Sequence, residues 1–259
     1  MLKIENLSFS YGKTQVFKDI DLQIDEGINI LIGPNAAGKS TLVKSIFGLL
    51  SPKGHISWKG KNLQDLNLED RMELMVYIPQ EDIAGNSLTV FETVLLGRLS
   101  SLTFKVQDKD LDAVMNALKT LRIENLAKRR LGELSGGQKK LVSIAQSLVR
   151  SPEIILMDEP TNNLDIQRQL ELFYVMSKIS TEKKILFIIV MHDINLSLKF
   201  ADNLIIMNSK GQIEKQGIPE NIIDEEILEE VYNIKAKVYR IDEKTMVWPE
   251  KSIGYSIKG

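Results

Sequence analysis

The sequence of 259 residues contains no cysteine and only two histidines, and it has no surplus of charge. Without cysteine there can be no disulfide framework and no thiolate chemistry, which suits a reducing compartment such as the cytosol. The 33 Lys and Arg residues nearly balance the 35 Asp and Glu residues, and the net charge of -2 creates no general field that would attract nucleic acid or anionic lipid. Any polyanion must therefore be held by a local site.

Long hydrophobic runs and a secretion signal are absent as well. The longest apolar run, 185–191, is far shorter than the ~20 residues that a helix needs to cross a bilayer. Residues 1–11 mix charged and apolar side chains and lack the basic flank and apolar block of a signal peptide. We therefore expect a cytoplasmic protein that does not itself span a membrane.

Apolar segments without alternation recur along the chain and predict strands that are buried on both faces. They occupy residues 28–32, 154–157, 185–190 and 204–207, with helical segments between them. This pattern predicts an α/β fold with a mainly parallel core sheet, which binds ligands beyond the carboxyl ends of its strands.

The first 27 residues follow a different pattern, in which apolar and polar side chains alternate. Leu2, Ile4, Leu22 and Ile24 have polar neighbours, which predicts a small antiparallel β layer in front of the core. Residues 55–58 are a candidate for a further strand of this layer.

Between residues 88 and 134 strand signals disappear and helical signals replace them. Thr89, followed by Glu92 three residues later, forms a capping box that opens a helix. The face of a second helix is predicted by apolar residues at i, i+3, i+4 and i+7, namely Leu111, Val114, Met115 and Leu118. We interpret residues 85–145 as a helical subdomain inserted into a core formed by residues 1–84 and 146–218.

The last part of the chain, 219–259, is predicted to be a C-terminal extension. Pro219 lies near the start of a helix that runs through Tyr232. Segments with β character follow around Val238 and Val247. A single domain with this extension accounts for the whole chain.

A glycine-rich segment carries a phosphate-binding motif. Residues 33–40 satisfy G-x-x-x-x-G-K-[ST], directly after the strand 28–32 and before a helical stretch. Lys39 would supply a positive charge at the β- and γ-phosphates, and Ser40 would offer a hydroxyl oxygen to Mg²⁺. The alternative is a simple turn with a helix-capping serine, but the flanking strand and helix favour a P-loop. The residues expected to contact the nucleotide are Gly33, Pro34, Asn35, Ala36, Ala37, Gly38, Lys39, Ser40 and Thr41.

Two carboxylates follow the buried strand 154–157. Asp158 and Glu159 stand at the carboxyl end of that strand, where a parallel sheet places its ligands. We expect Asp158 to hold Mg²⁺ through its water shell and Glu159 to orient or deprotonate the attacking water. A solvated acidic turn before Pro160 is the alternative, which the P-loop in the same chain disfavours.

A second glycine-rich segment, Leu134 to Gln138, precedes the helical stretch 139–150. Gly136 and Gly137 expose N–H groups at a helix start, so the chain carries two helix termini directed at phosphate. Taken alone, such a Ser-Gly-Gly segment is more often a flexible turn or a helix cap.

With these motifs in order, the sequence resembles the ATP-binding cassette (ABC) ATPases over nearly its full length. The successive motifs are the P-loop, Gln80 after Tyr77-Ile78-Pro79, the signature 134–138, the acidic strand end 154–159, the segment 163–165 and His192. The resemblance implies a P-loop NTPase (RecA-like) core, ATP and Mg²⁺ as cofactors, and ATP hydrolysis.

The resemblance also implies roles that residue chemistry alone leaves open. Tyr11 would stack on adenine, and Gln80 would bind Mg²⁺ and couple it to the contact with a membrane permease. His192 would touch the γ-phosphate, and Asp165 would communicate across a dimer. The ATP site of a second subunit would be completed by the signature residues Ser135, Gly136, Gly137 and Gln138.

Two positions depart from the family pattern. Ala36 stands where the family usually has Gly, and Leu141 stands where an Arg usually follows the signature. Neither change removes a ligand. Ala36 would be strained if its φ angle were positive, because that conformation is costly for any residue except Gly.

Within the family, three segments look most like ATPases that import iron-siderophores, haem or cobalamin: 94–98, 164–169 and 217–232. The resemblance therefore implies a subunit that powers import of a metal chelate or related solute through a separate permease. It would pair with a second ATPase subunit, in a homodimer, on the inner face of the cell membrane. A solute-binding protein would be an indirect partner.

Other functions of the fold remain as alternatives. A soluble ABC ATPase without a permease, for example in iron–sulfur cluster assembly, stays open. Cassettes directed at nucleic acid or ribosomes usually insert long coiled coils or place two cassettes on one chain, and this sequence has neither feature, so no nucleic-acid partner is expected. A scaffold without catalysis is disfavoured because Glu159 and His192 are both present.

Overall fold

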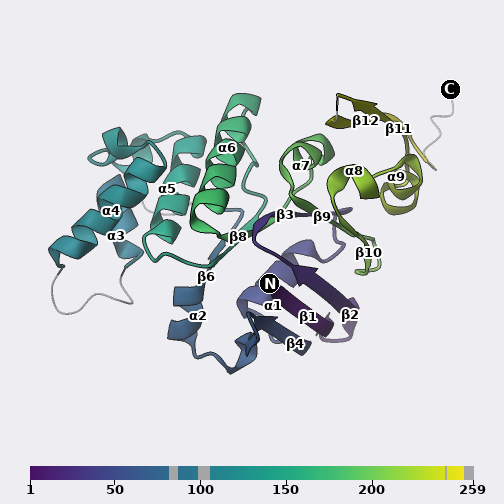
Figure 1. Cartoon of the computed structure of the whole chain (residues 1–259), viewed down its shortest axis with the longest axis horizontal. Coiled ribbons are helices and arrows are strands. Elements are labelled where there is room, and N and C mark those ends of the chain that lie inside the picture. Colours follow the sequence, from purple (N-terminus) through teal and green to yellow (C-terminus); the bar gives the residue numbers. More distant parts are fainter. Residues whose placement is uncertain (82–86, 99–105, 243, 254–259) are drawn as a thin grey trace. The chain divides into compact units, whose positions relative to one another are not determined.

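The computed structural model describes residues 1–81, 87–98, 106–242 and 244–253 (Figure 1). The chain divides into two compact units. Unit 1 comprises Met1–Asp65 and Phe187–Gly259, and unit 2 comprises Leu66–Leu186. The predicted subdomain 85–145 does not coincide with this division. Its first two residues and 99–105 lie outside the described residues, and its boundaries stay a prediction.

Unit 1 contains the antiparallel layer predicted for the N-terminus. Its strands are β1 (Leu2–Tyr11), β2 (Thr14–Ile24), β4 (Lys53–Trp58) and β5 (Lys61–Asn62), in the order β2-β1-β4-β5. The apolar residues of the alternating pattern, Leu2, Ile4, Leu22 and Ile24, are all buried. The pattern therefore exists because one face of this sheet covers the core.

The central strands of unit 1 are the continuous apolar runs. β3 (Gly27–Ile32), β8 (Leu186–Val190), β9 (Asn203–Met207) and β10 (Ile213–Gly217) follow the order β10-β9-β3-β8. β3 and β9 are parallel, and β10 is antiparallel to β9. Every residue of β8 is buried, as a strand covered on both faces requires. The predicted α/β fold with a mostly parallel sheet is confirmed.

The helices of unit 1 are α1 (Lys39–Phe47), α7 (Ile194–Phe200), α8 (Pro219–Ile222) and α9 (Glu225–Tyr232). A C-terminal hairpin is formed by the strands β11 (Ile234–Ile241) and β12 (Lys244–Ser252).

The single helix predicted from Pro219 to Tyr232 is wrong, because the chain breaks at Ile223 and Asp224. The Asp224 carboxylate accepts a hydrogen bond from the Ile227 N–H at 2.7 Å. That side chain caps α9 and so starts a new helix.

Unit 2 is mainly helical around one strand pair. The parallel strands β6 (Met75–Ile78) and β7 (Ile154–Asp158) are accompanied by α2 (Leu68–Leu74), α3 (Val90–Leu96), α4 (Asp108–Thr120), α5 (Gly136–Leu148) and α6 (Ile166–Lys183). The predicted capping box is present at α3, where the Thr89 N–H donates to Glu92 at 2.8 Å and the Glu92 N–H donates to Thr89 Oγ1 at 3.2 Å.

No helix within the described ranges is both long and apolar enough to cross a membrane.

The predicted apolar face of α4 is partly wrong. Leu111 is 38% exposed, whereas its neighbour Asp110 is only 2% exposed. Arg98 Nε lies 2.8 Å from the Asp110 carboxylate, and the Gln107 N–H donates to the same group at 3.0 Å. These two donors stabilise the buried charge, so Asp110 takes the place on the buried face that the apolar pattern assigned to Leu111, while Val114 and Leu118 are buried as predicted.

Candidate nucleotide-binding site

The P-loop of unit 1 connects β3 to α1. Gly38 precedes the helix with a φ angle of 100°, and the first turn consists of Lys39, Ser40 and Thr41. The N–H groups of a first helical turn point out of the helix end, and the helix dipole favours an anion there. The motif thus has the strand, the turn and the helix start that a phosphate-binding loop requires.

Two glycines are required by close contacts with neighbouring strands. A Cβ atom on Gly33 would lie 2.2 Å from the Met207 carbonyl oxygen, at the end of β9. A Cβ atom on Gly38 would lie 2.8 Å from Val16 Cγ1 on β2. Glycine at both positions allows the loop to lie tightly against these strands, which fixes its path.

Lys39 is held inside the loop. Its side chain is buried, and its Nζ atom donates to the carbonyl oxygens of Gly33 and Pro34, both at 2.8 Å. The ammonium group therefore stands where its charge faces the loop interior. Ala36 has a φ angle of 62°, so the strain expected at this departure from the family pattern is present.

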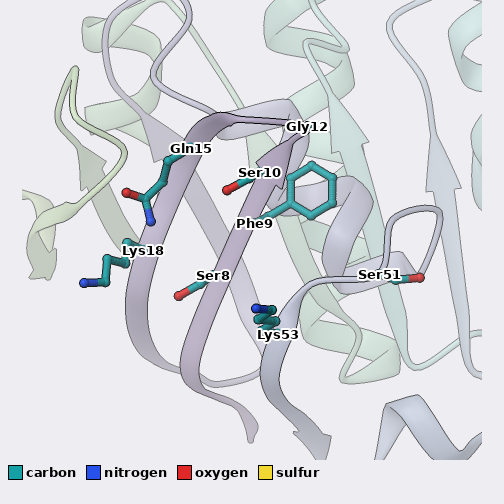
Figure 2. A pocket seen from close by; sticks show the side chains of 8 residues that line it. All are labelled: Ser8, Phe9, Ser10, Gly12, Gln15, Lys18, Ser51 and Lys53. Carbon is teal, nitrogen blue, oxygen red and sulfur yellow. The ribbon is translucent and has the colours of Figure 1, made fainter.

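Tyr11 lies at the end of the β1–β2 hairpin and is 54% exposed. The Phe9 ring contacts it edge-on, with ring centroids 4.9 Å apart. Phe9 also lines a pocket of about 520 Å³ whose other lining residues are Ser8, Ser10, Gly12, Gln15, Lys18, Ser51 and Lys53 (Figure 2). Polar and cationic groups dominate this pocket, whereas Tyr11 presents an exposed aromatic ring. Tyr11 is therefore the better candidate for stacking on a base.

His192 lies two residues after the end of β8 and is exposed. The N–H of Met191 donates to the Leu31 carbonyl at 3.1 Å, which joins the ends of β8 and β3. The P-loop and the loop of His192 therefore leave the same edge of the sheet. The next residue, Asp193, caps α7 by accepting from the Leu196 N–H at 2.9 Å.

The acidic pair of unit 2 lies at the end of β7. Asp158 is buried, and the Tyr77 hydroxyl donates to its Oδ2 atom at 3.3 Å. Burial raises the pKa of Tyr77 well above its usual range, and the Asp158 charge and hydrogen bond raise it further. Tyr77 therefore remains a neutral hydrogen-bond donor to the carboxylate.

Glu159 has strained backbone geometry. Its φ angle is 47°, in the left-handed region, and the following Pro160 disfavours the right-handed helical alternative. The Glu159 carboxylate accepts a short hydrogen bond from the Asn162 amide. Strain of this kind often accompanies functional sites, and here it fixes the direction of a carboxylate.

Gln80 is exposed at the end of β6, and its backbone is held by the signature helix. Lys140, on α5, is only 2% exposed, and its Nζ atom donates to the carbonyl oxygens of Pro79 and Gln80, both at 3.4 Å. Sequence reasoning missed Lys140, although its place i−4 to the buried Ile144 is a usable signal. It also missed Asn162.

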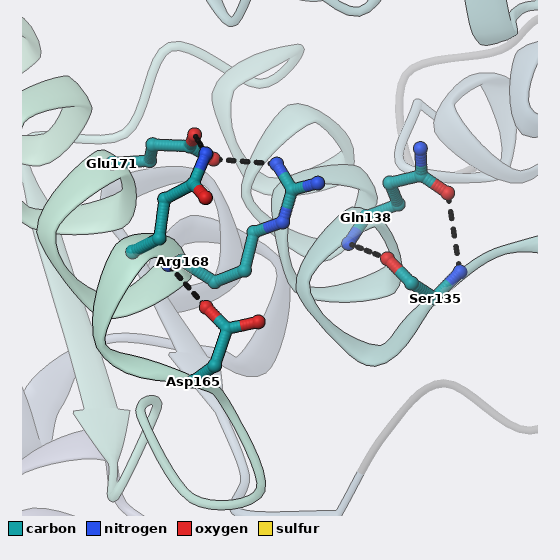
Figure 3. A network of polar contacts seen from close by, with 6 residues as sticks. Ser135, Gln138, Asp165, Arg168 and Glu171 are labelled. Carbon is teal, nitrogen blue, oxygen red and sulfur yellow. Dashed lines mark hydrogen bonds and ion pairs between the residues drawn. The ribbon is translucent and has the colours of Figure 1, made fainter.

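The signature segment lies beside the start of α6. Ser135 caps α5, accepting from the Gln138 N–H at 3.4 Å while its own N–H donates to Gln138 at 3.1 Å (Figure 3). Asp165 caps α6 through the Arg168 N–H at 2.9 Å. A Cβ atom on Gly137 would lie 3.4 Å from the Arg168 side chain, so the two helix starts touch.

The expected Mg²⁺ ligands come from both units. Ser40 belongs to unit 1, and Gln80 and Asp158 belong to unit 2, so their common site remains a prediction. Among the described residues, no group of three or more His, Asp or Glu side chains is placed so that it could hold a metal ion. A hydroxyl, an amide oxygen and a carboxylate nevertheless fit Mg²⁺, which prefers oxygen ligands and retains water and phosphate in its coordination sphere.

Comparison with known sequences agrees with these motifs. The sequence profile of the ABC transporter family matches residues 17–162. An uncharacterized ABC transporter ATP-binding protein of Methanocaldococcus jannaschii is 38% identical over 93% of this chain and 94% of its own length. The petrobactin import ATP-binding protein of Bacillus anthracis is 34% identical over 92% of this chain and 88% of its own length.

Solved structures extend the likeness beyond the profile. A structure described as an inward-facing conformation of a metal-chelate type ABC transporter is 25% identical, with a TM-score of 0.82, over 96% of this chain and 97% of its own. A dimeric bacterial ABC transporter cassette is 26% identical, with a TM-score of 0.72, over 84% of this chain and 98% of its own. Profile, relatives and structures agree with the P-loop, signature and acidic strand end, and the chain therefore belongs to the ABC transporter family, as an ATP-binding subunit that hydrolyses ATP.

Proposed function

We propose that this ATPase powers import of a ferric siderophore or a related metal chelate through a separate membrane permease. The observation that carries the proposal is the likeness to the metal-chelate transporter structure, which covers 96% of this chain. The part left out is much shorter than the extension 219–259, so the likeness includes most of that extension. The petrobactin import protein is similar over 92% of the chain as well.

In the proposed reaction, Tyr11 stacks on adenine and the P-loop holds the phosphates. Ser40, Gln80 and Asp158 would hold Mg²⁺, which would neutralise charge on the β- and γ-phosphates. Glu159 orients a water molecule and accepts its proton as the water oxygen bonds to the γ-phosphorus. The bond from that phosphorus to the bridging oxygen breaks, and His192 contacts the γ-phosphate.

We further propose that ATP binds between two copies of this chain. Each chain carries one P-loop and one signature, so a head-to-tail pair would form two equivalent sites. Ser135, Gly136, Gly137 and Gln138 of one copy would face the γ-phosphate held by the other, with Asp165 at the same interface. The dimeric state of a similar cassette supports this arrangement.

Coupling to transport would pass through Gln80. Its side chain is a predicted Mg²⁺ ligand, and its backbone is bonded to Lys140 on the signature helix. A permease that contacts unit 2 could therefore shift Gln80 and the signature together. We propose that the ATPase binds the permease at the cytoplasmic face of the membrane.

The test is reconstitution of the complex that the chain forms in its native membrane. We expect a permease to co-purify, and ATP hydrolysis to rise when a binding protein loaded with ⁵⁵Fe-siderophore is added. Gln80→Ala should leave nucleotide affinity nearly unchanged while it uncouples hydrolysis from ⁵⁵Fe uptake. Unaltered uptake in that variant would contradict the coupling role, and the absence of any permease would favour the soluble ABC ATPase.

A further inference from the structure

The C-terminal extension contacts the edge of unit 1 that carries the nucleotide loops. Two side chains make these contacts: Tyr232, the last residue of α9, and Asn195, near the start of α7. The first side chain reaches the beginning of the P-loop, and the second lies three residues after His192. The extension therefore reaches the start of the P-loop and the first turn of α7, which follows the loop of His192.

Tyr232 presents its hydroxyl to the P-loop. The hydroxyl is excluded from solvent and makes no hydrogen bond of ordinary geometry with the residues that the structure describes. Burial raises the pKa of Tyr232 well above its usual range, and the backbone N–H of Gly33 partly opposes this effect. A neutral hydroxyl thus lies beside the N–H of Gly33, while the carbonyl of the same residue accepts from Lys39 Nζ at 2.8 Å.

Gly33 has two polar neighbours. The buried Tyr232 hydroxyl lies near its N–H group, and Lys39 Nζ donates a hydrogen bond to its carbonyl oxygen. The residue also lies close to the Met207 carbonyl, where no side chain would fit. A change in the position of α9 would move Gly33 and, through it, the Lys39 ammonium group.

Asn195 binds the hairpin of the extension with both ends of its amide. Asn195 Nδ2 donates to the Val247 carbonyl at 3.0 Å, and the Val247 N–H donates to Asn195 Oδ1 at 2.8 Å. Val247 is 2% exposed, so this pair of bonds lies at the edge of a buried contact. The loop from His192 to Asn195 is therefore fixed at its far end by β12.

The extension is itself fastened to the core. Lys215 on β10 donates to the Asp224 carboxylate at 3.0 Å, and Asp224 caps α9. Arg240 on β11 donates to the carbonyl oxygens of Glu220 and Ile223 at 3.3 and 3.1 Å. α9 and the hairpin are thus tied to β10 and to the end of α8.

We propose that Tyr232 and Asn195 are positioning residues for ATP hydrolysis, through which the C-terminal extension holds the P-loop and the loop of His192. Tyr232 sets the affinity for ATP because it acts on Gly33 and Lys39. Asn195 sets the rate of turnover because it acts on the loop of His192. This inference rests on the proposed roles of the P-loop and His192, and it is independent of the transported solute.

The test separates KM from kcat in the full-length chain. Tyr232→Phe should raise the KM for ATP about threefold, in the lower part of the range for a hydrogen bond because the contact with Gly33 has poor geometry, and leave kcat nearly unchanged. Asn195→Ala should lower kcat about 25-fold, because each of its two ordinary hydrogen bonds contributes about fivefold, and leave KM within about twofold of the wild-type value. Tyr239→Phe, on the exposed face of the same hairpin, is the matched control and should change neither constant.

Stability distinguishes positioning from a general structural role. Removing a buried hydroxyl that lacks a good partner should leave the Tm of Tyr232→Phe equal to or above that of the wild type. Altered KM with an undiminished Tm supports the proposal, and unchanged KM overturns it for Tyr232. Unchanged kcat in Asn195→Ala at a temperature below its Tm overturns the proposal for Asn195.

A second readout does not depend on turnover. The chain has two tryptophans, Trp58 and Trp248, so a Trp58→Phe background leaves Trp248 on β12 as the sole reporter. ATP should change Trp248 fluorescence in this background, and the change should shrink at least twofold when Tyr232→Phe is added. If ATP causes no fluorescence change although bound radiolabelled ATP is detected, the proposal is overturned.

Lys39→Ala should abolish ATP binding altogether, and if it does not, the P-loop assignment itself is wrong.

Discussion

At the residue scale, Ala36 shows how a departure from a family pattern becomes a measurable strain. Its φ angle of 62° costs a residue with a Cβ atom roughly 1–2 kcal/mol, whereas the extra unfolded-state entropy of glycine costs about 0.4–1 kcal/mol. We therefore expect Ala36→Gly to raise the free energy of unfolding by about 0.5 kcal/mol in urea denaturation, with ATP affinity retained.

Ala37 offers the matched control for this prediction. It is buried, and its φ angle is negative. Ala37→Gly should lower the free energy of unfolding by about 1 kcal/mol, because glycine gains no relief there and loses entropy. Equal destabilisation by both substitutions would show that Ala36 carries no strain.

Glu159 is the residue on which hydrolysis should depend most strongly. Glu159→Gln preserves the size and the bond to Asn162 but cannot accept a proton from water, so turnover should fall at least about 100-fold while ATP still binds. Mg²⁺-ATP should then accumulate a dimer on gel filtration. Hydrolysis at the wild-type rate would remove Glu159 from the role of general base.

Residues of the site differ in how readily the sequence reveals them. Lys39, Ser40 and Glu159 stand in contiguous motifs beside recognisable strands, and local pattern suffices to find them. Lys140 and Tyr232 act through contacts with segments about 60 and 200 residues away in the chain, so local spacing cannot show which residues they contact. Their roles become visible only when the fold brings those segments together.

At the element scale, the buried Lys140 links the signature helix α5 to the end of β6. Lys140→Met would remove the donor to the carbonyls of Pro79 and Gln80, and we expect a loss of about 1–3 kcal/mol in the free energy of unfolding. Turnover should fall several-fold with ATP affinity unchanged, because Gln80 loses its link to the signature.

The adjacent Lys139 provides the comparison. It is less buried than Lys140, and Lys139→Met should change stability by no more than about 0.5 kcal/mol. Steady-state ATPase assays measure the turnover of both variants, and nucleotide titrations measure their affinity for ATP. Wild-type turnover in Lys140→Met would mean that the contact between α5 and Gln80 has no part in hydrolysis.

Elements were predicted best where an apolar run is continuous. The runs that became β3, β7, β8 and β9 lie within one residue of the observed strands. The pattern failed at α4, where a hydrogen-bonded Asp110 replaces Leu111 on the buried face, and at α8 and α9, which the Asp224 cap separates. In each case a polar side chain with specific partners overrode the apolar pattern.

At the scale of the whole molecule, the order of motifs along the chain predicted an ABC ATPase. It did not predict the boundaries of the two compact units. The division at Asp65 and Phe187 depends on contacts between distant segments, such as β1 with β4 and β3 with β9. These pairings are long-range and leave no periodic signal in the sequence.

The central claim is that ATP is bound between the P-loop of one chain and the signature of another, and a mixing experiment tests it directly. Two variants are made in a Glu159→Gln background that retains ATP: one carries Lys39→Ala and the other carries Ser135→Arg. Either variant alone has both composite sites damaged, whereas a mixed dimer has one site intact and the other doubly damaged.

The measurement is the amount of dimer, and of ATP within it, after gel filtration of each variant and of their mixture with Mg²⁺-ATP. We predict that neither variant dimerises alone and that the mixture yields a dimer containing one ATP. A mixture that stays monomeric, or a dimer that forms equally well from Lys39→Ala alone, would contradict the shared site.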